Sequence, residues 1–217
     1  TGEVAGALGA GTANVSGAVS LTGTTVATNL NITTGGVLTL GSAERIGATT
    51  LLDVNAGELA LGAFDNTVGG LTLQGGGLLS GTGTLTAATY ALQGGTVTAN
   101  LGAGTATVTL GNTLLNGLLG AAAVNIDSGS LILGGANRLA GGATVTLGGG
   151  TLDSGANATA VTTLQLNSGL VTGAGLLTAT TYNLVTGEVA GALGAGIANV
   201  SGAVSLTGTT VATNLNI

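Results

Sequence analysis

The sequence predicts an all-β fold, a parallel β-helix (β-solenoid) with roughly 18.5 residues per turn and about 11–12 turns. Three observations predict it. The chain has 217 residues, of which 44 are Gly, and it contains no Pro, Cys, Met, Trp or His. Its apolar residues alternate with small or polar residues over short stretches, which is the periodicity of β-strands. Finally, the whole chain is built from internal repeats at three length scales.

The composition excludes several classes of protein. Charged residues make up 5% of the chain, against about 25% in an ordinary globular domain. Without His or Cys, the chain has no imidazole or thiolate for catalysis or for zinc binding. The net charge is −6, and the only cations are Arg45 and Arg138. This balance has the wrong sign for binding nucleic acid, so no nucleic-acid partner is expected.

The longest repeat has a period of 185 residues. Residues 186–217 have the same sequence as residues 1–32, except that Ile197 replaces Thr12. Each period divides into two half-units of about 93 residues, because residues 84–108 match residues 176–200 at an offset of 92. We therefore expect one continuous solenoid over residues 1–217, with internal repeats at 1–93, 94–185 and 186–217.

The shortest repeat has the pattern apolar-x-apolar-x-x-Gly-x-apolar. The two apolar pairs suit short strands, and the Gly between them suits a corner with positive φ, which we expect at Gly95 and Gly150. Val108 begins a copy with Thr113 in the Gly position, and Val15 and Val200 begin degenerate copies. The full copies begin at Leu30, Leu52, Leu71, Tyr90, Val124, Val145, Leu164 and Tyr182.

A stack of such units explains the unusual composition. Each strand would pair in parallel with its counterpart in the next turn, so the backbone hydrogen bonds of one turn are completed by its neighbours. The interior of a narrow solenoid has room for only two or three small aliphatic side chains per turn. Proline is missing because it would remove a donor from the ladder.

The Gly-punctuated units GTLTAATYALQGG (83–95) and GSLILGGANRLAGGATVTLGGGTL (129–152) resemble the repeat regions of filamentous haemagglutinin-like adhesins. These are large bacterial exoproteins secreted by the two-partner route, and the passenger repeats of autotransporters look similar. The resemblance implies a right-handed parallel β-helix that forms a rod at the cell surface or in the biofilm matrix. It also implies an outer-membrane secretion partner and a role in cell-surface or cell-cell adhesion.

A second hypothesis is a binding module whose flat face recognises polysaccharide or ice. Ice recognition would require a regular column of Thr along one face. The residues that follow the first apolar position form a mixed column, which disfavours this hypothesis. They are Asn31, Asp53, Thr72, Ala91, Thr109, Asn125, Thr146, Gln165 and Asn183.

No catalytic, cofactor-binding or metal-binding residue is predicted, and the chain is not expected to be an enzyme. Glycoside hydrolysis needs two carboxyl groups about 5–9.5 Å apart, and the acids do not recur at matching positions of neighbouring units. We expect them at solvated corners, with Arg45 pairing with Glu44, and we expect Tyr90 and Tyr182 to be partly buried. The acids are Glu3, Glu44, Asp53, Glu58, Asp65, Asp127, Asp153 and Glu188.

The chain stops inside its own repeat, since Ile217 corresponds to Ile32. A solenoid cut at such a position exposes unpaired strand edges and a slice of its aliphatic core. We therefore expect this segment to be stable within a longer protein or by stacking end to end.

Overall fold

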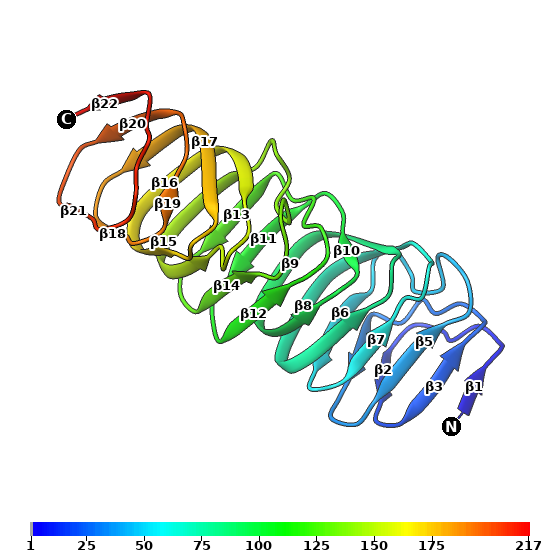
Figure 1. Cartoon of the computed structure of the whole chain (residues 1–217). Helices are drawn as coiled ribbons and strands as arrows, with labels where there is room; N and C mark the ends of the chain where they lie inside the picture. The colour runs from blue at the N-terminus through cyan, green and yellow to red at the C-terminus, as the bar shows by residue number, and fades with distance from the viewer. Residues whose placement is uncertain (1) are drawn as a thin grey trace.

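A computed structural model describes residues 2–217, which wind into one elongated solenoid (Figure 1). These residues form 22 strands and no helix. All the strands belong to one sheet, and neighbouring turns are joined by parallel pairing. The chain makes about 12 turns with a spacing of about 18 residues. The predicted β-solenoid is therefore confirmed.

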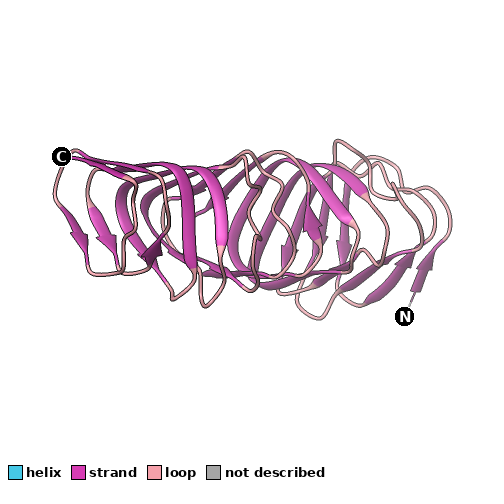
Figure 2. Ribbon diagram, turned by 45° about the horizontal axis from the view of Figure 1, so that its top comes forward, coloured by secondary structure: helices cyan, strands magenta, loops and turns pink. Residues whose placement is uncertain are grey.

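Most strands are short, and five longer ones bend around a corner of the solenoid (Figure 2). The longer strands are β8 (Asn66–Ser80), β9 (Thr84–Val97), β15 (Thr144–Asp153), β16 (Thr159–Thr172) and β17 (Leu176–Leu184). The others are β1 (Gly2–Val4), β2 (Thr12–Val15), β3 (Ala18–Leu21), β4 (Asn29–Ile32), β5 (Val37–Leu40), β6 (Leu51–Asn55), β7 (Glu58–Ala60), β10 (Asn100–Leu101), β11 (Thr105–Val108), β12 (Asn112–Leu115), β13 (Ala123–Ile126), β14 (Ser130–Leu133), β18 (Gly187–Val189), β19 (Ala192–Leu193), β20 (Ile197–Val200), β21 (Val204–Leu206) and β22 (Asn214–Asn216).

The pairings define three faces. Face A contains β2, β4, β6, β11, β13, β20 and β22, together with the central parts of β8, β9 and β16, the start of β15 and the end of β17. Face B contains β1, β3, β5, β7, β12, β14, β18 and β21, with the ends of β8, β9, β15 and β16. Face C is shorter and consists of β10, β19, the starts of β8, β9, β16 and β17, and isolated bridges.

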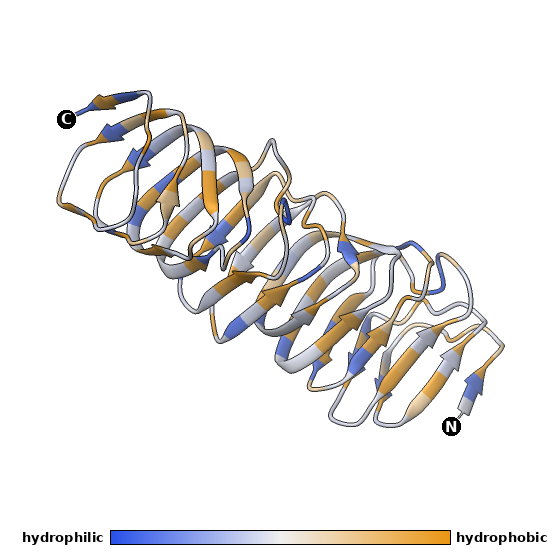
Figure 3. Cartoon of the chain, viewed as in Figure 1, coloured by the Kyte–Doolittle hydropathy of each residue, from blue (hydrophilic) through white to orange (hydrophobic). Residues whose placement is uncertain are grey.

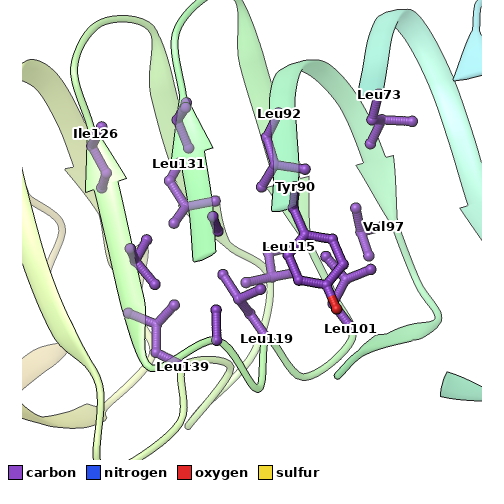
Figure 4. Close-up of a cluster of buried hydrophobic side chains, with 14 of the residues drawn as sticks. Leu73, Tyr90, Leu92, Val97, Leu101, Leu115, Leu119, Ile126, Leu131 and Leu139 are labelled. Carbon is purple, nitrogen blue, oxygen red and sulfur yellow. The ribbon is translucent and has the colours of Figure 1, made fainter. Parts of the chain in front are cut away.

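The core is a narrow column of Leu, Val, Ile and Ala side chains along the axis of the solenoid. Buried and more exposed residues alternate along the strands, as in β4 and β13, and the same alternation appears in the hydropathy of the ribbon (Figure 3). Like stacks on like in many places: Leu30 pairs with Leu52, and Leu52 pairs with Leu71. Each turn thus buries a few aliphatic side chains against the two turns beside it (Figure 4).

The register corrects the predicted unit in three of its copies. Val108 pairs with Leu92 and Ile126, so it occupies the second apolar position and not the first. Ala106 occupies the first position. Thr113 pairs with Gly95, as predicted, and with Leu131 in the following turn, while Gly111 supplies the corner residue with φ 59°. The unit beginning at Val15 is shifted in the same way, and so is the unit beginning at Val200. The pattern missed these starts because Ala is a weak apolar signal.

Two further apolar residues of the pattern face outward. In the units that begin at Leu30 and Leu71, the buried residues of face B are Leu38 and Leu79, and the preceding Val37 and Leu78 are only partly buried. One extra residue at the corner moves the inward position by one. Because strand periodicity is two, this shift exchanges the inward and outward side chains.

The motif glycines are required for two different reasons. Gly95 has φ 147° and lies in the region that favours glycine, as predicted. Gly150 has no positive φ, which corrects that prediction. A Cβ atom at Gly150 would lie 2.6 Å from Cγ2 of Ile126 and 2.9 Å from the carbonyl oxygen of Gly129. Gly150 is therefore needed because adjacent turns pack too closely for a side chain.

Among residues 2–217, no helix has the length and apolar character needed to cross a membrane.

We predict that Gly150→Ala destabilises the solenoid and that Gly141→Ala does not. A Cβ at Gly141 would have no atom within 4 Å, and Gly141 has no positive φ. Overpacking at Gly150 should cost about 1–3 kcal/mol, whereas the substitution at Gly141 should change stability by about 0.5 kcal/mol or less. Denaturant unfolding of both variants measures the difference. Equal stabilities would show that the turns are not packed this closely at Gly150.

Candidate functional site

Six of the eight acidic side chains link one turn to the next. Thr22 donates to Glu3 at 2.8 Å, and the equivalent Thr207 donates to Glu188 at 3.1 Å, so this link recurs after one full period. Ser80 donates to Glu58 at 2.5 Å. Further inter-turn links are Gln74 to Asp53, the backbone N–H of Thr84 to Asp65, and both the backbone N–H and the hydroxyl of Thr67 to Glu44.

The register does not bring two acids together. Glu58 lies between Val37 and Leu78 on face B, and Glu188 lies between Leu170 and Ser205. Within residues 2–217, no group of three or more Asp or Glu side chains is placed to hold a metal ion. The acids therefore contribute hydrogen bonds between turns, and the described residues give them no shared cleft.

The two arginines lie at a corner beside face C, and among the described residues only Arg45 hydrogen-bonds to the backbone through its side chain, while Nε of Arg138 is buried without a partner. Arg45 donates from Nε to the carbonyl oxygen of Ala43 at 3.0 Å and from Nη1 to that of Thr22 at 3.3 Å. The expected pairing of Arg45 with Glu44 is not formed, because the Glu44 carboxylate accepts hydrogen bonds from Thr67. Arg138 lies over Gly135, where a Cβ atom would approach its Nε to 2.5 Å.

Tyr90 and Tyr182 are core residues of face A, with exposed fractions of 1% and 0%. Each side chain crosses the interior, and its hydroxyl reaches backbone groups of the opposite wall (Figure 4 for Tyr90). The Tyr182 hydroxyl donates to the carbonyl oxygens of Leu177 at 2.9 Å and Gly194 at 3.1 Å, and it accepts from the N–H of Ala179 at 2.9 Å. The two tyrosines are buried more completely than the sequence predicted, so they are not surface platforms for sugar rings.

Burial raises the pKa of both phenols, and the hydrogen bonds from backbone N–H groups lower it by less. The uncharged phenol is therefore the form that the core accepts. No other polar side chain of the core is as long.

Six shorter polar residues are also buried among the described residues, namely Thr25, Thr50, Asn66, Thr113, Ser154 and Thr159. Asn66 accepts a hydrogen bond from the N–H of Ile46 at 3.0 Å and donates to its carbonyl oxygen at 3.1 Å, so its amide takes the place of a strand neighbour. The hydroxyls of Thr113 and Thr159 have no hydrogen-bond partner within the described residues. The side-chain amide of Asn66 therefore has hydrogen-bond partners within the fold, whereas the two unpaired hydroxyls destabilise the folded state.

Amide ladders form at both ends of face A. Asn31 donates to Asn14 at 2.8 Å. Near the other end, Asn199 donates to Asn183 at 3.0 Å and Asn216 donates to Asn199 at 2.8 Å. All five side chains occupy the outward position after the first apolar residue. They satisfy one another, which is a structural role.

A column of threonines lies beside that position and was missed by the sequence reasoning. The outward residues that precede the first apolar position include Thr in five of six successive turns, at Thr89, Thr105, Thr144, Thr163 and Thr181. The sixth is Ala123. We call these six residues the Thr column. In the neighbouring column, after the first apolar position, the structure places Thr107 and not the predicted Thr109.

An open depression of the surface runs along the corner between faces C and A. It is lined mainly by small residues, including Ala160, Ala179, Ala195, Gly196 and Thr213. No charged or titratable side chain lines it. The depression follows from the small residues at this corner and offers no reactive group.

Comparison with protein-family models, with curated protein sequences and with solved structures gives no match to this chain.

We predict that alkaline pH destabilises the solenoid through its two tyrosines. Because burial raises their pKa above the ordinary value of 10.0, the folded state holds these protons more tightly than the unfolded state. The contribution of the two tyrosines to the free energy of unfolding is therefore fully present below pH 10 and decreases as the pH rises above 10. The chain has no Lys or Cys, so no other side chain titrates near this pH.

The measurement is unfolding by denaturant as a function of pH, with wild type compared with the double variant Tyr90→Phe, Tyr182→Phe. The variant should lose about 1–1.5 kcal/mol per hydroxyl at neutral pH and should show no loss of stability between pH 10 and the titration of arginine. If the double variant also loses stability above pH 10, the two tyrosines are not the cause of the pH dependence.

Proposed function

We propose that this chain is a structural rod segment of a large secreted bacterial adhesin, which holds other parts of the protein away from the cell surface. The observation that carries the proposal is the uniformity of the solenoid: about 12 turns share the same three faces and one aliphatic core. Equivalent positions Leu30 and Leu215 are ten turns apart. At about 4.8 Å per turn, one period of the repeat extends the rod by about 48 Å.

The polar residues support a mechanical role. Carboxylates and hydroxyls are directed along the rod, from one turn to the next, as between Glu58 and Ser80 or Glu188 and Thr207. Parallel pairing repeats the same backbone contacts at every turn. A repeat of this kind can lengthen by duplication without a new core, which suits a protein that gains reach. Adhesion, secretion and a biofilm-matrix location come from the resemblance of the repeats to filamentous haemagglutinin-like adhesins.

The rod is tested by deleting whole turns. Deletion of residues 109–200 joins Val108 to Ser201 in register, because Val108 and Val200 occupy equivalent positions. This deletion removes five turns, and small-angle X-ray scattering should show a rod about 24 Å shorter with the same cross-section. The matched control is deletion of residues 109–191, which removes an incomplete set of turns and should disrupt folding.

A shortened chain with a changed cross-section, or equal tolerance of both deletions, would contradict the proposal that the chain is a rod.

The proposal that the chain belongs to an adhesin has its own test. An antibody against this chain should label intact cells that produce it, and labelling that appears only after lysis would contradict a surface location.

The Thr column favours one further candidate, a neutral face that binds polysaccharide or ice. Its five hydroxyls have no hydrogen-bond partner in the described residues, unlike those of Thr22, Thr67 or Thr207. They repeat at about 4.8 Å, the spacing of the turns. Neither this column nor the outward column after the first apolar position contains a charge between Thr89 and Tyr182.

If this face binds such a surface, Thr144→Tyr with Thr163→Tyr should weaken the binding at least tenfold, because bulky rings break the flat column. Thr39→Tyr on face B is the matched control and should have no effect. The assays are retention on insoluble cellulose or chitin and inhibition of ice recrystallisation. No activity of the wild-type chain in either assay would remove this candidate.

A further inference from the structure

Two charged side chains in the middle of the rod are not paired within the described part of the chain. Asp127 is exposed, and its carboxylate is the one of the eight that accepts no hydrogen bond among residues 2–217. Arg138 donates no side-chain hydrogen bond among the same residues, and its Nε is buried without an acceptor. Asp127 lies at the corner before β14, and Arg138 lies at the corner after it. The acid and the cation therefore occupy opposite edges of face B, at about the same height along the rod.

Arg138 lacks the two acids that surround the other arginine of the chain. In the corner of that arginine, the N–H of Glu44 donates to the carbonyl oxygen of Asp65 at 3.1 Å. In the corner of Arg138, the equivalent hydrogen bond runs from Asn137 to Ala158 at 3.0 Å. An amide and a methyl group thus replace two carboxylates, and the positive charge of Arg138 is left without a local counter-charge.

The part of face B between these two edges carries an apolar column. Its outward residues pair with one another in four successive turns, are partly exposed, and are Leu78, Thr96, Leu114 and Ile132. An exposed leucine lies at each edge of the third of these turns, Leu110 before β12 with 60% of its surface exposed and Leu118 after β12 with 41%. We call these six residues the face B patch. No charged residue occurs in the sequence between Asp65 and Asp127.

We propose that the face B patch binds the same patch of a second copy of this chain, with the two rods parallel and side by side. A two-fold axis that runs between the rods, parallel to them, exchanges the two edges of face B and keeps the height. Asp127 of each copy then meets Arg138 of the other, and Leu114 and Ile132 meet their own counterparts. The result is an apolar centre with two ion pairs at its rim, which is the usual arrangement of a protein interface.

The charges specify this occupant and its direction. An antiparallel copy docked on the same patch would place Asp127 against Asp127, whereas the parallel copy pairs each charge with its opposite. The inference needs only the solenoid fold and goes beyond the proposed rod, since it does not depend on the adhesin assignment.

Two acids of the same column limit the patch to four turns. Glu58 pairs with Leu78 at one end, and Asp153 pairs with Ile132 at the other. The two-fold axis places each of these acids near its own counterpart, so repulsion opposes a longer contact. Their carboxylates already accept hydrogen bonds from Ser80 and from the N–H of Gly155. A contact of this size is expected to give a weak dimer.

The test is sedimentation equilibrium of the 217-residue chain and of two charge reversals, Asp127→Arg and Arg138→Asp. Each variant alone should dimerise about tenfold more weakly or less, because both ion pairs become like-charge contacts. An equimolar mixture of the two variants should regain the dimerisation of the wild type, because every contact again joins opposite charges. The matched control is Ala122→Arg, an exposed position beyond the edges of face B, which should have no effect.

Asp153→Asn gives a second measurement that does not rely on weakening the dimer. It should strengthen dimerisation by about threefold or more, because it removes a like-charge contact and keeps the acceptor for the N–H of Gly155. A wild-type chain that stays monomeric, or an association that neither charge reversal changes, would overturn the proposal. So would a mixture of the two reversals that dimerises no better than either variant alone.

Discussion

The structure depends on parallel backbone pairing between successive turns. A turn of a solenoid has no partner within itself, so its amide and carbonyl groups are satisfied only by the turns on either side. This requirement fixes the inward positions, because a shift of one residue would exchange the buried and exposed side chains. It also keeps the turns close together, which is why Gly150 has no room for a Cβ atom. Composition follows from the same constraint: small residues at the corners and no proline in the ladder.

A core this narrow leaves few ways to use a large or polar side chain. Tyr90 and Tyr182 are possible because the next turn supplies Ala and Gly where the ring needs space. Asn66 is possible because its amide replaces a strand neighbour of Ile46. Thr113 and Thr159 have no such compensation and leave buried hydroxyls unpaired. Six of the eight carboxylates accept hydrogen bonds from hydroxyl, amide or backbone N–H donors of the next turn, whereas Asp153 accepts from the N–H of Gly155 in its own turn.

The sequence was sufficient to predict the solenoid and its turn length, because period and strand alternation are properties of the pattern alone. It failed where position depends on the local corner. Val37 and Leu78 were indistinguishable in sequence from inward residues, and one added residue at the corner turned them outward. Ala106 was overlooked as a first apolar position because only its neighbour Tyr90 shows why the residue must be small. The Thr column could have been found by aligning every outward position, since it depends on the same register.

The buried tyrosines and Asn66 also fix the register between turns in an otherwise uniform stack. A chain whose turns are nearly interchangeable can pair a strand with the wrong turn and still complete its backbone hydrogen bonds. A slip by one turn would put Leu215 where Ala198 makes room for the ring of Tyr182, and Asn66 beside a backbone that is already paired, so such a slip is costly. A slip by five turns brings Tyr90 to the site of Tyr182 and is penalised far less. Folding of long arrays of this repeat would therefore have one characteristic error, misalignment by whole half-units, and the differences between half-units, such as Asn66 against Thr159, are what oppose it.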